Sequence, residues 1–182
     1  MTQSSLDPAP AQPDPVPAAF SRVTLARVMG VTDANLLGNV HGGVIMHLVD
    51  TTAGSAAGRH CGMPAVTAFV DELAFLEPVR VGDILTCQAQ VNWTGRTSME
   101  VGVRVSAQPW NDARNEALHV ASAYLVFVAI GPDGRPLPVP PVSHDNDRDR
   151  LREHEAEIRR TSRLERRRAI HEWRASASAS GG

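Results

Sequence analysis

The amino-acid sequence predicts an α+β fold in which an antiparallel sheet wraps around one long central helix, with a charged helical extension near the C-terminal end. Three observations support this class. An apolar pattern of helical period runs from Val44 to His60, segments of strand period follow it, and the links between those segments are short. One early strand, the helix and four later strands fit into 182 residues as a single domain with appendages.

The predicted helix follows a glycine pair, Gly42-Gly43, that lets the backbone approach a ligand closely. A helix start presents unpaired N–H groups and a positive dipole end, which bind anions or a developing oxyanion. Asp50 lies seven residues after Gly43, so it returns almost to the same azimuth about 10 Å further along the axis. Amide donors and a carboxylate therefore share one face of the helix, which indicates an active site.

The strands are predicted from alternation. Residues 84–93 alternate between an apolar face that includes Trp93 and a polar face, as in a half-exposed strand. The alternation resumes over residues 97–105, and Gly95-Arg96 between the two segments predicts a hairpin tip. Two further stretches are more uniformly apolar and are predicted to be more buried strands: 65–75 and 119–130.

The two ends differ in composition from the folded domain, which we expect to span residues 18–141. Residues 1–17 are rich in proline, alanine and aspartate and are expected to be a disordered lead-in. Residues 142–174 are expected to form the charged helical extension, and residues 175–182 a flexible tail. The extension has sparse apolar residues as its expected anchors: Leu151, Ile158, Leu164, Ile170 and Trp173.

Composition agrees with a cytoplasmic enzyme that has no membrane partner. The chain is 42% hydrophobic, has only two cysteines, and carries neither a secretory apolar segment nor an apolar run of membrane-spanning length. It contains no lysine, so all 18 basic residues are arginine. Any phosphate must therefore be bound by arginine side chains or backbone amides.

The glycine and histidine residues also allow two other interpretations. In the first, the glycine pair forms a plain turn and Asp50 is a solvated helix residue. In the second, His41 and His47 belong to a metal site. No further ligands follow at zinc-like spacing, and the two cysteines lack the C-x-x-C pairing, so no metal site is predicted.

Several motifs in order resemble one family. The segment from Asn39 to Val44, followed by Leu48-Val49-Asp50, Ala53-Gly54 and Arg59-His60-Cys61, is similar to the helix region of the hot-dog-fold acyl-CoA thioesterases. Within that family it most resembles the cytosolic brain-type acyl-CoA hydrolase group and its short bacterial relatives. The resemblance extends over about residues 22–141 through further segments in the same order: 66–71, 75–79, 81–83, 95–101 and 134–140.

The resemblance implies a hot-dog fold and an enzyme that hydrolyses acyl-CoA without a cofactor, since coenzyme A is part of the substrate and product. The position of Asp50 implies a general base that activates water, or a carboxylate nucleophile, and the two remain open. Asn39 is implied to orient water or the carbonyl group, and the Gly43 amide to stabilise the oxyanion.

The resemblance also implies where CoA binds. Its positions include His41 and Gly42, together with the hairpin residues Gly95, Arg96, Thr97 and Ser98. Arg96 is the expected phosphate partner. The alternative is a solvated arginine at an ordinary hairpin tip.

Self-association is implied as well, as a hot-dog dimer that joins edge strands into a continuous sheet, and often as a trimer of such dimers. The exposed edges of a partly closed sheet give this pairing a physical motive. In two-domain relatives the asparagine and aspartate positions are intact in different halves, whereas Asn39 and Asp50 lie in one chain here. A homodimer is therefore expected to form two sites, each with Asn39 from one protomer and Asp50 from the other.

A competing function is a non-catalytic acyl-CoA sensor or scaffold whose C-terminal helix binds nucleic acid. Residues 159–174 contain seven arginines and two acidic residues, which permits this. The acidic residues of 145–157 precede that segment and the formal net charge is −2, so no nucleic-acid partner is predicted. A hot-dog hydratase is disfavoured because its His-and-Asp signature is not evident. The acyl chain length is left undetermined.

Overall fold

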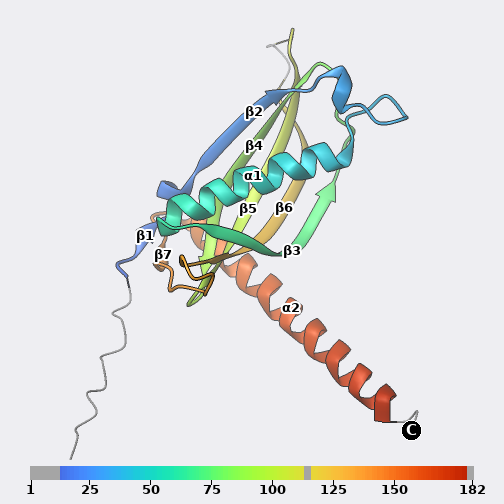
Figure 1. The fold of residues 1–182 in the computed structure, drawn as a ribbon. Coiled ribbons are helices and arrows are strands. Elements are labelled where there is room, and N and C mark those ends of the chain that lie inside the picture. Colours follow the sequence, from blue (N-terminus) through green and yellow to red (C-terminus); the bar gives the residue numbers. More distant parts are fainter. Residues whose placement is uncertain (1–12, 113–115, 180–182) are drawn as a thin grey trace, which may run out of the picture.

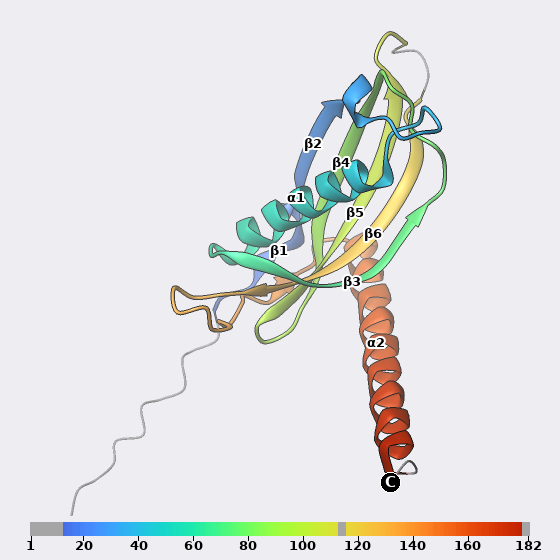
Figure 2. The same cartoon turned by 45° about the vertical axis from the view of Figure 1, so that its right-hand side comes forward.

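The computed structural model describes residues 13–112 and 116–179 (Figure 1). Five antiparallel strands form its main sheet: β2 (Val23–Val28), β3 (Ala65–Phe75), β4 (Asp83–Thr94), β5 (Ser98–Pro109) and β6 (Leu118–Ala129). Their spatial order is β2-β4-β5-β6-β3. The sheet curves around α1 (Gly42–Cys61), which lies along its concave face (Figures 1 and 2). The hot-dog architecture and the predicted order of elements are thereby confirmed.

Shorter elements complete the chain. Two 3-10 helices flank β2: η1 (Ala18–Ser21) and η2 (Val31–Asp33). A small parallel pair joins β1 (Val16–Pro17) to β7 (Val142–Ser143), and the long helix α2 (Asp147–Ala179) follows. Neither α1 nor α2, as far as the structure describes them, combines the length and apolarity needed to cross a membrane.

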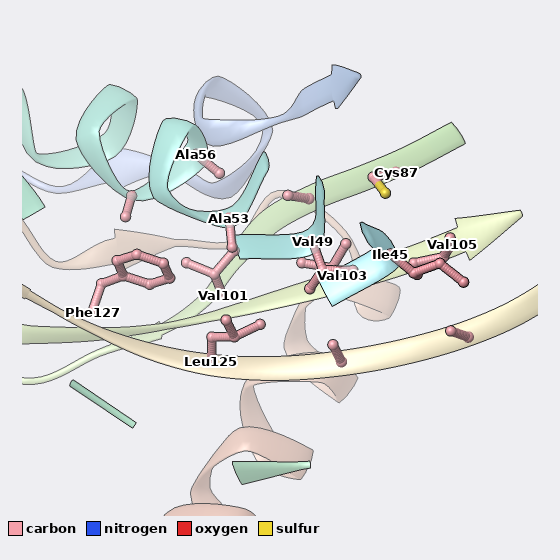
Figure 3. Close-up of a cluster of buried hydrophobic side chains, with 14 of the residues drawn as sticks. Ile45, Val49, Ala53, Ala56, Cys87, Val101, Val103, Val105, Leu125 and Phe127 are labelled. Carbon is pink, nitrogen blue, oxygen red and sulfur yellow. The ribbon is translucent and has the colours of Figure 1, made fainter. Parts of the chain in front are cut away.

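Small residues allow α1 to lie close to the sheet. Ala53, Ala56 and Ala57 are fully buried, and Gly54 lies against the Phe127 ring, where a Cβ atom would come within 3.4 Å. Figure 3 shows the α1 side chains that face β4, β5 and β6: Ile45, Val49, Ala53 and Ala56. Burying each of the larger aliphatic side chains contributes about 1.5–3 kcal/mol. This packing fixes the direction in which the start of α1 points.

The hairpin of β4 and β5 matches the prediction except at Trp93. A β-bulge between Val91 and Trp93 adds one residue to β4, so that Trp93 pairs with Glu100. The Arg160 guanidinium of α2 lies 5.1 Å from the centroid of the Trp93 ring. Trp93 is therefore on the outer face, and its predicted place on the inner apolar face is wrong, because one extra residue reverses the alternation.

Part of the outer face of the sheet is polar and nevertheless buried. Gln90 and Asn92 of β4 and Glu100 of β5 are 7%, 3% and 2% exposed. They are covered by α2, which crosses this face on the side opposite α1 (Figure 2). The prediction of a half-exposed β4 strand holds for its first half, where Thr86 is partly exposed and Gln88 is exposed, and is wrong at Gln90 and Asn92. Sequence alternation does not reveal that a second helix covers the polar side there.

The first turn of α2 is anchored by the buried carboxylate of Asp149. It accepts hydrogen bonds from Gln90 (2.8 Å), Asn146 (2.7 Å) and Arg152 (2.9 Å), and Arg22 lies 3.2 Å away. Burial by itself would raise the pKa of Asp149, but the three hydrogen bonds and the charge of Arg22 outweigh it and hold the pKa below its usual value.

Two arginines anchor α2 further along. Arg159 donates to both carboxylate oxygens of Glu100, at 2.7 and 3.2 Å, and stacks 3.6 Å from the centroid of the Tyr124 ring. Arg163 pairs with Asp71 and lies over Phe69, both on β3. The apolar residues expected as anchors of this segment are 42–71% exposed, so that expectation is wrong. The surface beneath α2 instead offers carboxylates and aromatic rings, which bind the guanidinium groups of arginine.

The boundaries at the two ends also differ from the prediction. Residues 16–17 belong to β1 and not to a disordered lead-in, because Val16 N–H donates to the Pro141 carbonyl at 2.8 Å. The helix α2 continues to Ala179 through residues expected to be flexible, since alanine and serine continue a helix once it has formed. Residues 1–12 and 180–182, which include most of the expected lead-in, lie outside the described residues.

The Arg159–Glu100 pair gives a stability prediction. Removing one partner of a buried ion pair costs about 3–5 kcal/mol. The Glu100 side chain is 3% exposed, so we expect Arg159→Ala to lower the free energy of unfolding by about 3 kcal/mol in a urea titration. The control Arg148→Ala, on an exposed position of the same helix, is expected to change it by less than about 0.5 kcal/mol. Equal stability of the two variants would contradict the anchoring role of Arg159.

Candidate active site

The loop that enters α1 is held by Asn35. Its side-chain oxygen accepts hydrogen bonds from the N–H groups of Leu37 (2.8 Å) and Asn39 (3.2 Å), and its backbone N–H donates to the Asn39 carbonyl (2.7 Å). Gly38 closes the turn with a φ of 80°, a conformation that favours glycine. The Asn35 side-chain NH₂ has no partner among the described residues, so it is free to donate to a ligand.

Asn39 leads from this loop to the helix start. It forms an isolated antiparallel bridge with Arg80, and the next residue, Val40, donates its N–H to the Val79 carbonyl at 2.8 Å. His41 N–H donates to the Asp33 carbonyl at 2.8 Å. The backbone around Asn39 is thereby fixed on both sides, which leaves its side chain available to a ligand.

His41 caps the start of α1. Its Nδ1 atom accepts the Gly43 N–H at 2.9 Å, which requires the tautomer without a proton on Nδ1. The donor that the sequence assigns to an oxyanion is therefore used within the chain. Gly42 N–H, one residue earlier, has no partner in the part of the chain that the structure describes. Of these two amides, Gly42 N–H is therefore the one left free to donate to a ligand.

A cleft of about 350 Å³ opens at this helix start. It brings together Asn35, Asn39 and Gly42, with apolar walls from β3 and the segment that follows it. The wall is so close that a Cβ atom on Gly42 would lie 3.5 Å from the Phe75 ring. Such a cleft can hold an apolar group beside amide donors. Its remaining lining residues are Val40, Ile45, Leu76, Glu77, Pro78 and Val79.

Asp50 lies outside that cleft, on an exposed face of α1. Its Oδ1 atom accepts a hydrogen bond from the Thr67 hydroxyl at 2.6 Å. Thr67 is on β3, the edge strand of the sheet, so the carboxylate is oriented across that edge. Thr67 was not among the predicted site residues, although it lies within the family motif at 66–71. With one oxygen oriented by Thr67, the other is available to a water molecule or a carbonyl carbon.

The hairpin tip is positioned at the other end of α1. Gly95 N–H donates to the Ser98 carbonyl at 2.7 Å, and a Cβ atom on Gly95 would lie 2.8 Å from the Trp93 ring, so glycine is required there. Arg96 is exposed, and its carbonyl accepts the Val139 N–H at 3.0 Å. Thr97 and Ser98 follow it, and both are partly buried.

Within one chain, the hairpin tip at Arg96 lies far from the start of α1. Val139 precedes Pro140, whose carbonyl lies 3.0 Å from His60 Nε2 in the last turn of α1. Gly42 and His60 are eighteen residues apart, about 27 Å along the helix. Arg96 is therefore remote from Asn39 and Gly43 within a single protomer.

The edge strand beside Asp50 is apolar and unpaired on one side. Five large side chains on β3 and the residue after it are 41–53% exposed: Val66, Phe69, Val70, Phe75 and Leu76. The prediction of a more buried strand at residues 65–75 is therefore wrong, because β3 lies at an edge of the sheet. A row of open backbone groups with exposed apolar side chains favours pairing with another strand. The open edge beside Asp50 is therefore a surface on which another strand can pair.

The remaining reactive residues are structural. Burial lowers the pKa of His60. Burial also raises the pKa of Cys61, and it raises the pKa of Cys87 to about 11, so neither thiol is an activated nucleophile. His47 is exposed on α1. Among residues 13–112 and 116–179, no three histidine, cysteine, aspartate or glutamate side chains gather in a way that could hold a metal ion.

Comparison with known proteins gives consistent matches. The family model described as the thioesterase superfamily matches residues 37–110. The human cytosolic acyl coenzyme A thioester hydrolase is 36% identical over 140 residues, which are 77% of this chain and 37% of that protein. The chain thus spans little more than a third of the length of this curated relative.

Two solved structures match more completely. A structure described as an apo-hexameric acyl-CoA thioesterase is 32% identical, with a TM-score of 0.80 over 84% of this chain and 97% of that one. The acyl-CoA hydrolase of Staphylococcus aureus, in complex with butyryl coenzyme A, coenzyme A and coenzyme A disulfide, is 31% identical, with a TM-score of 0.79 over 90% and 98%. Alanine variants of an asparagine, an aspartate and a threonine of the same enzyme are also known structurally.

Proposed function

The chain belongs to the thioesterase superfamily, among the hot-dog acyl-CoA thioester hydrolases, and on this premise we propose that it hydrolyses acyl-CoA to a free carboxylic acid and CoA. The observation that carries the proposal is Asp50, held by Thr67 at 2.6 Å beside an open sheet edge. A lone exposed helix aspartate has no structural need for such a contact. An oriented carboxylate near free amide donors suits attack on a thioester carbonyl.

The spacing of three residues along the sequence supports Asn35 as a further member of the site. In the Staphylococcus enzyme, the asparagine that was replaced lies fifteen positions before the aspartate, and the threonine lies seventeen positions after it. The same residue types recur at the same spacing as Asn35, Asp50 and Thr67. This favours Asn35 as the asparagine that acts with Asp50, four residues before the predicted Asn39. Both asparagines line the same cleft, so an experiment has to separate them.

The reaction balances with these groups alone. Asp50 takes a proton from water while the water oxygen attacks the carbonyl carbon, and the Gly42 N–H stabilises the oxyanion that forms. The C–S bond then breaks, and the CoA thiolate takes the proton. Attack by Asp50 itself, through an anhydride that water hydrolyses, is the alternative. General-base catalysis contributes about 10²–10⁴-fold and an oxyanion donor about 10²–10³-fold.

We propose that the complete site forms between two copies joined along β3. Strand pairing about a two-fold axis makes the two α1 helices antiparallel, and an axis that crosses α1 between its start and Asp50 sets the start of one helix beside Asp50 of the other. Asp50 of one copy then faces the asparagine cleft of the second. The relative described as hexameric supports association in general, and a trimer of such dimers remains part of this proposal.

The same geometry supports a CoA site at the hairpin. The tip at Arg96 lies beside the C-terminal end of α1, and an antiparallel helix pair brings that end towards the helix start of the second copy. Arg96 then binds a CoA phosphate while Gly95, Thr97 and Ser98 shape the tip, and His41 and Gly42 lie at the thioester end. CoA is substrate and product here, and the proposed reaction uses no separate cofactor.

The first test removes the carboxylate. Asp50→Asn keeps the side-chain size and the oxygen that meets Thr67, and we expect kcat to fall by at least about 10²-fold. Released CoA can be measured with a thiol-reactive dye, because both protein thiols are buried. The control Ser55→Ala, which removes only a hydroxyl bonded to the Thr51 carbonyl on the exposed side of α1, is expected to stay near wild type. Near-normal turnover of a folded, assembled Asp50→Asn protein would refute the mechanism.

The second test concerns the hairpin. If Arg96 binds a phosphate, Arg96→Ala should raise KM for acyl-CoA with a smaller effect on kcat, and the wild-type KM should rise with salt concentration. The control is Arg135→Ala, an 84% exposed arginine on another turn. Equal KM values for wild type and Arg96→Ala, together with no salt dependence, would return Arg96 to the solvated-turn alternative.

The third test asks whether the site crosses the interface and which asparagine it uses. Asp50→Ala is co-expressed at equal levels with Asn35→Ala, and separately with Asn39→Ala. Random pairing makes half the dimers mixed, each with one intact site of two, so activity should recover to about a quarter of wild type. We expect recovery with Asn35→Ala. Recovery only with Asn39→Ala would show that Asn39, and not Asn35, acts with Asp50. Recovery with neither, from parents that are each inactive, would place both groups of the site in one chain.

A further inference from the structure

We propose that the part of α2 beyond Arg163, residues 164–177, docks on the outer face of a second copy of this chain and holds the two copies together. The inference rests on the β3 pairing proposed above, and it adds a contact that the edge strands do not supply. It starts from the path of α2. The helix contacts Gln90 on β4 first, then Glu100 on β5, and finally Asp71 on β3 through Arg163.

The helix does not end where the sheet ends. Strand β3 is the last strand on that side, and α2 continues for sixteen residues past Arg163. Sixteen helical residues span about 24 Å, which equals about five strand spacings. Figures 1 and 2 both show this half of α2 leaving the body beside β3 with no strand of the same chain beneath it. It therefore extends into the space that a second copy, paired along β3, would occupy.

The projecting half keeps the face that contacts the sheet. Ala156, buried to 1% exposure, Arg163 and Ile170 are spaced by seven residues and therefore lie on one stripe. Trp173 follows one turn later beside this stripe. Ile170 and Trp173 are 45% and 71% exposed, although the same stripe is buried where the sheet lies beneath it. An exposed tryptophan and isoleucine on a sheet-facing stripe indicate a missing contact surface.

The outer face of β3 offers a matching surface. Phe69 meets Arg163 of α2, and Phe69 and Val66 are 41% and 45% exposed. In a second copy joined antiparallel along β3, the same two side chains lie on the same side of the continuous sheet. Ile170 and Trp173 can pack against the parts of these side chains that Arg163 of the second copy leaves exposed.

A second copy fits this face better than a nucleic acid does. Three arginines of the segment on which the competing nucleic-acid interpretation depends already contact the sheet: Arg159 on Glu100, Arg160 over Trp93, and Arg163 on Asp71. The exposed groups on the continuing stripe are apolar, which favours a protein surface. The consequence is that α2 strengthens the interface on which the proposed two-chain active site depends.

Truncation tests this contact. A stop codon in place of Leu164 keeps the residues that anchor α2 up to Arg163, so the protomer should still fold, with a circular dichroism spectrum that loses only the helical signal of the removed residues. We expect the dimer dissociation constant, from sedimentation equilibrium, to rise at least tenfold, and Ile170→Asp to do the same. The matched control Leu151→Asp changes an exposed residue over the chain's own sheet, and its dissociation constant should stay unchanged. A dimer dissociation constant of the truncated chain equal to that of wild type would overturn the proposal. Loss of a hexamer that leaves dimers as stable as in wild type would overturn it too.

Cross-linking tests the location. Two differently tagged copies are co-expressed, one with Ile170→Cys and the other with Val66→Cys, and are then oxidised. A disulfide-linked pair carrying both tags is expected, and Leu151→Cys in place of Ile170→Cys should give none. Absence of the pair in a preparation that hydrolyses acyl-CoA overturns the docking alone. A linked pair in an inactive wild-type protein overturns the proposed function alone.

Discussion

The close approach of α1 to the curved sheet is the constraint on which the other features depend. Ala53, Ala56 and Ala57 are fully buried, so the helix axis lies where larger residues would push it away. That position fixes the helix start over the cleft and directs Asp50 towards Thr67 on β3. Because Gly42 and Asp50 are carried by one rigid helix, their separation of about two turns within the chain is fixed by backbone geometry.

The two faces of the sheet are buried by different chemistry. The inner face packs aliphatic side chains against α1, whereas the outer face buries Gln90, Asn92 and Glu100 beneath α2. Buried polar groups are costly unless they are paired, and here arginines of α2 supply the charges and hydrogen bonds. The absence of lysine suits this arrangement, because a guanidinium can bind both oxygens of a carboxylate and stack on a ring together, as Arg159 does.

The open edge at β3 connects the site with assembly. Asp50, the unpaired strand and the projecting half of α2 all lie towards that edge. In the proposed assembly, a second copy supplies an asparagine cleft to Asp50, a paired strand to β3 and a surface beneath Ile170 to α2. One symmetric association would satisfy all three, because every contact made by one copy is returned by the other.

The sequence by itself determined the order of elements, the helix from the glycine pair to His60, the hairpin at Gly95 and the position of Asp50 on the helix face, because these follow from local periodicity and turn chemistry. Tertiary structure decided the rest. The bulge that moves Trp93 to the outer face, the capture of the Gly43 amide by His41 and the contact of Thr67 with Asp50 depend on atoms that are close in space and not in a repeating pattern. The burial of the polar face under α2 has the same origin, since alternation records which residues share a face but not what covers it.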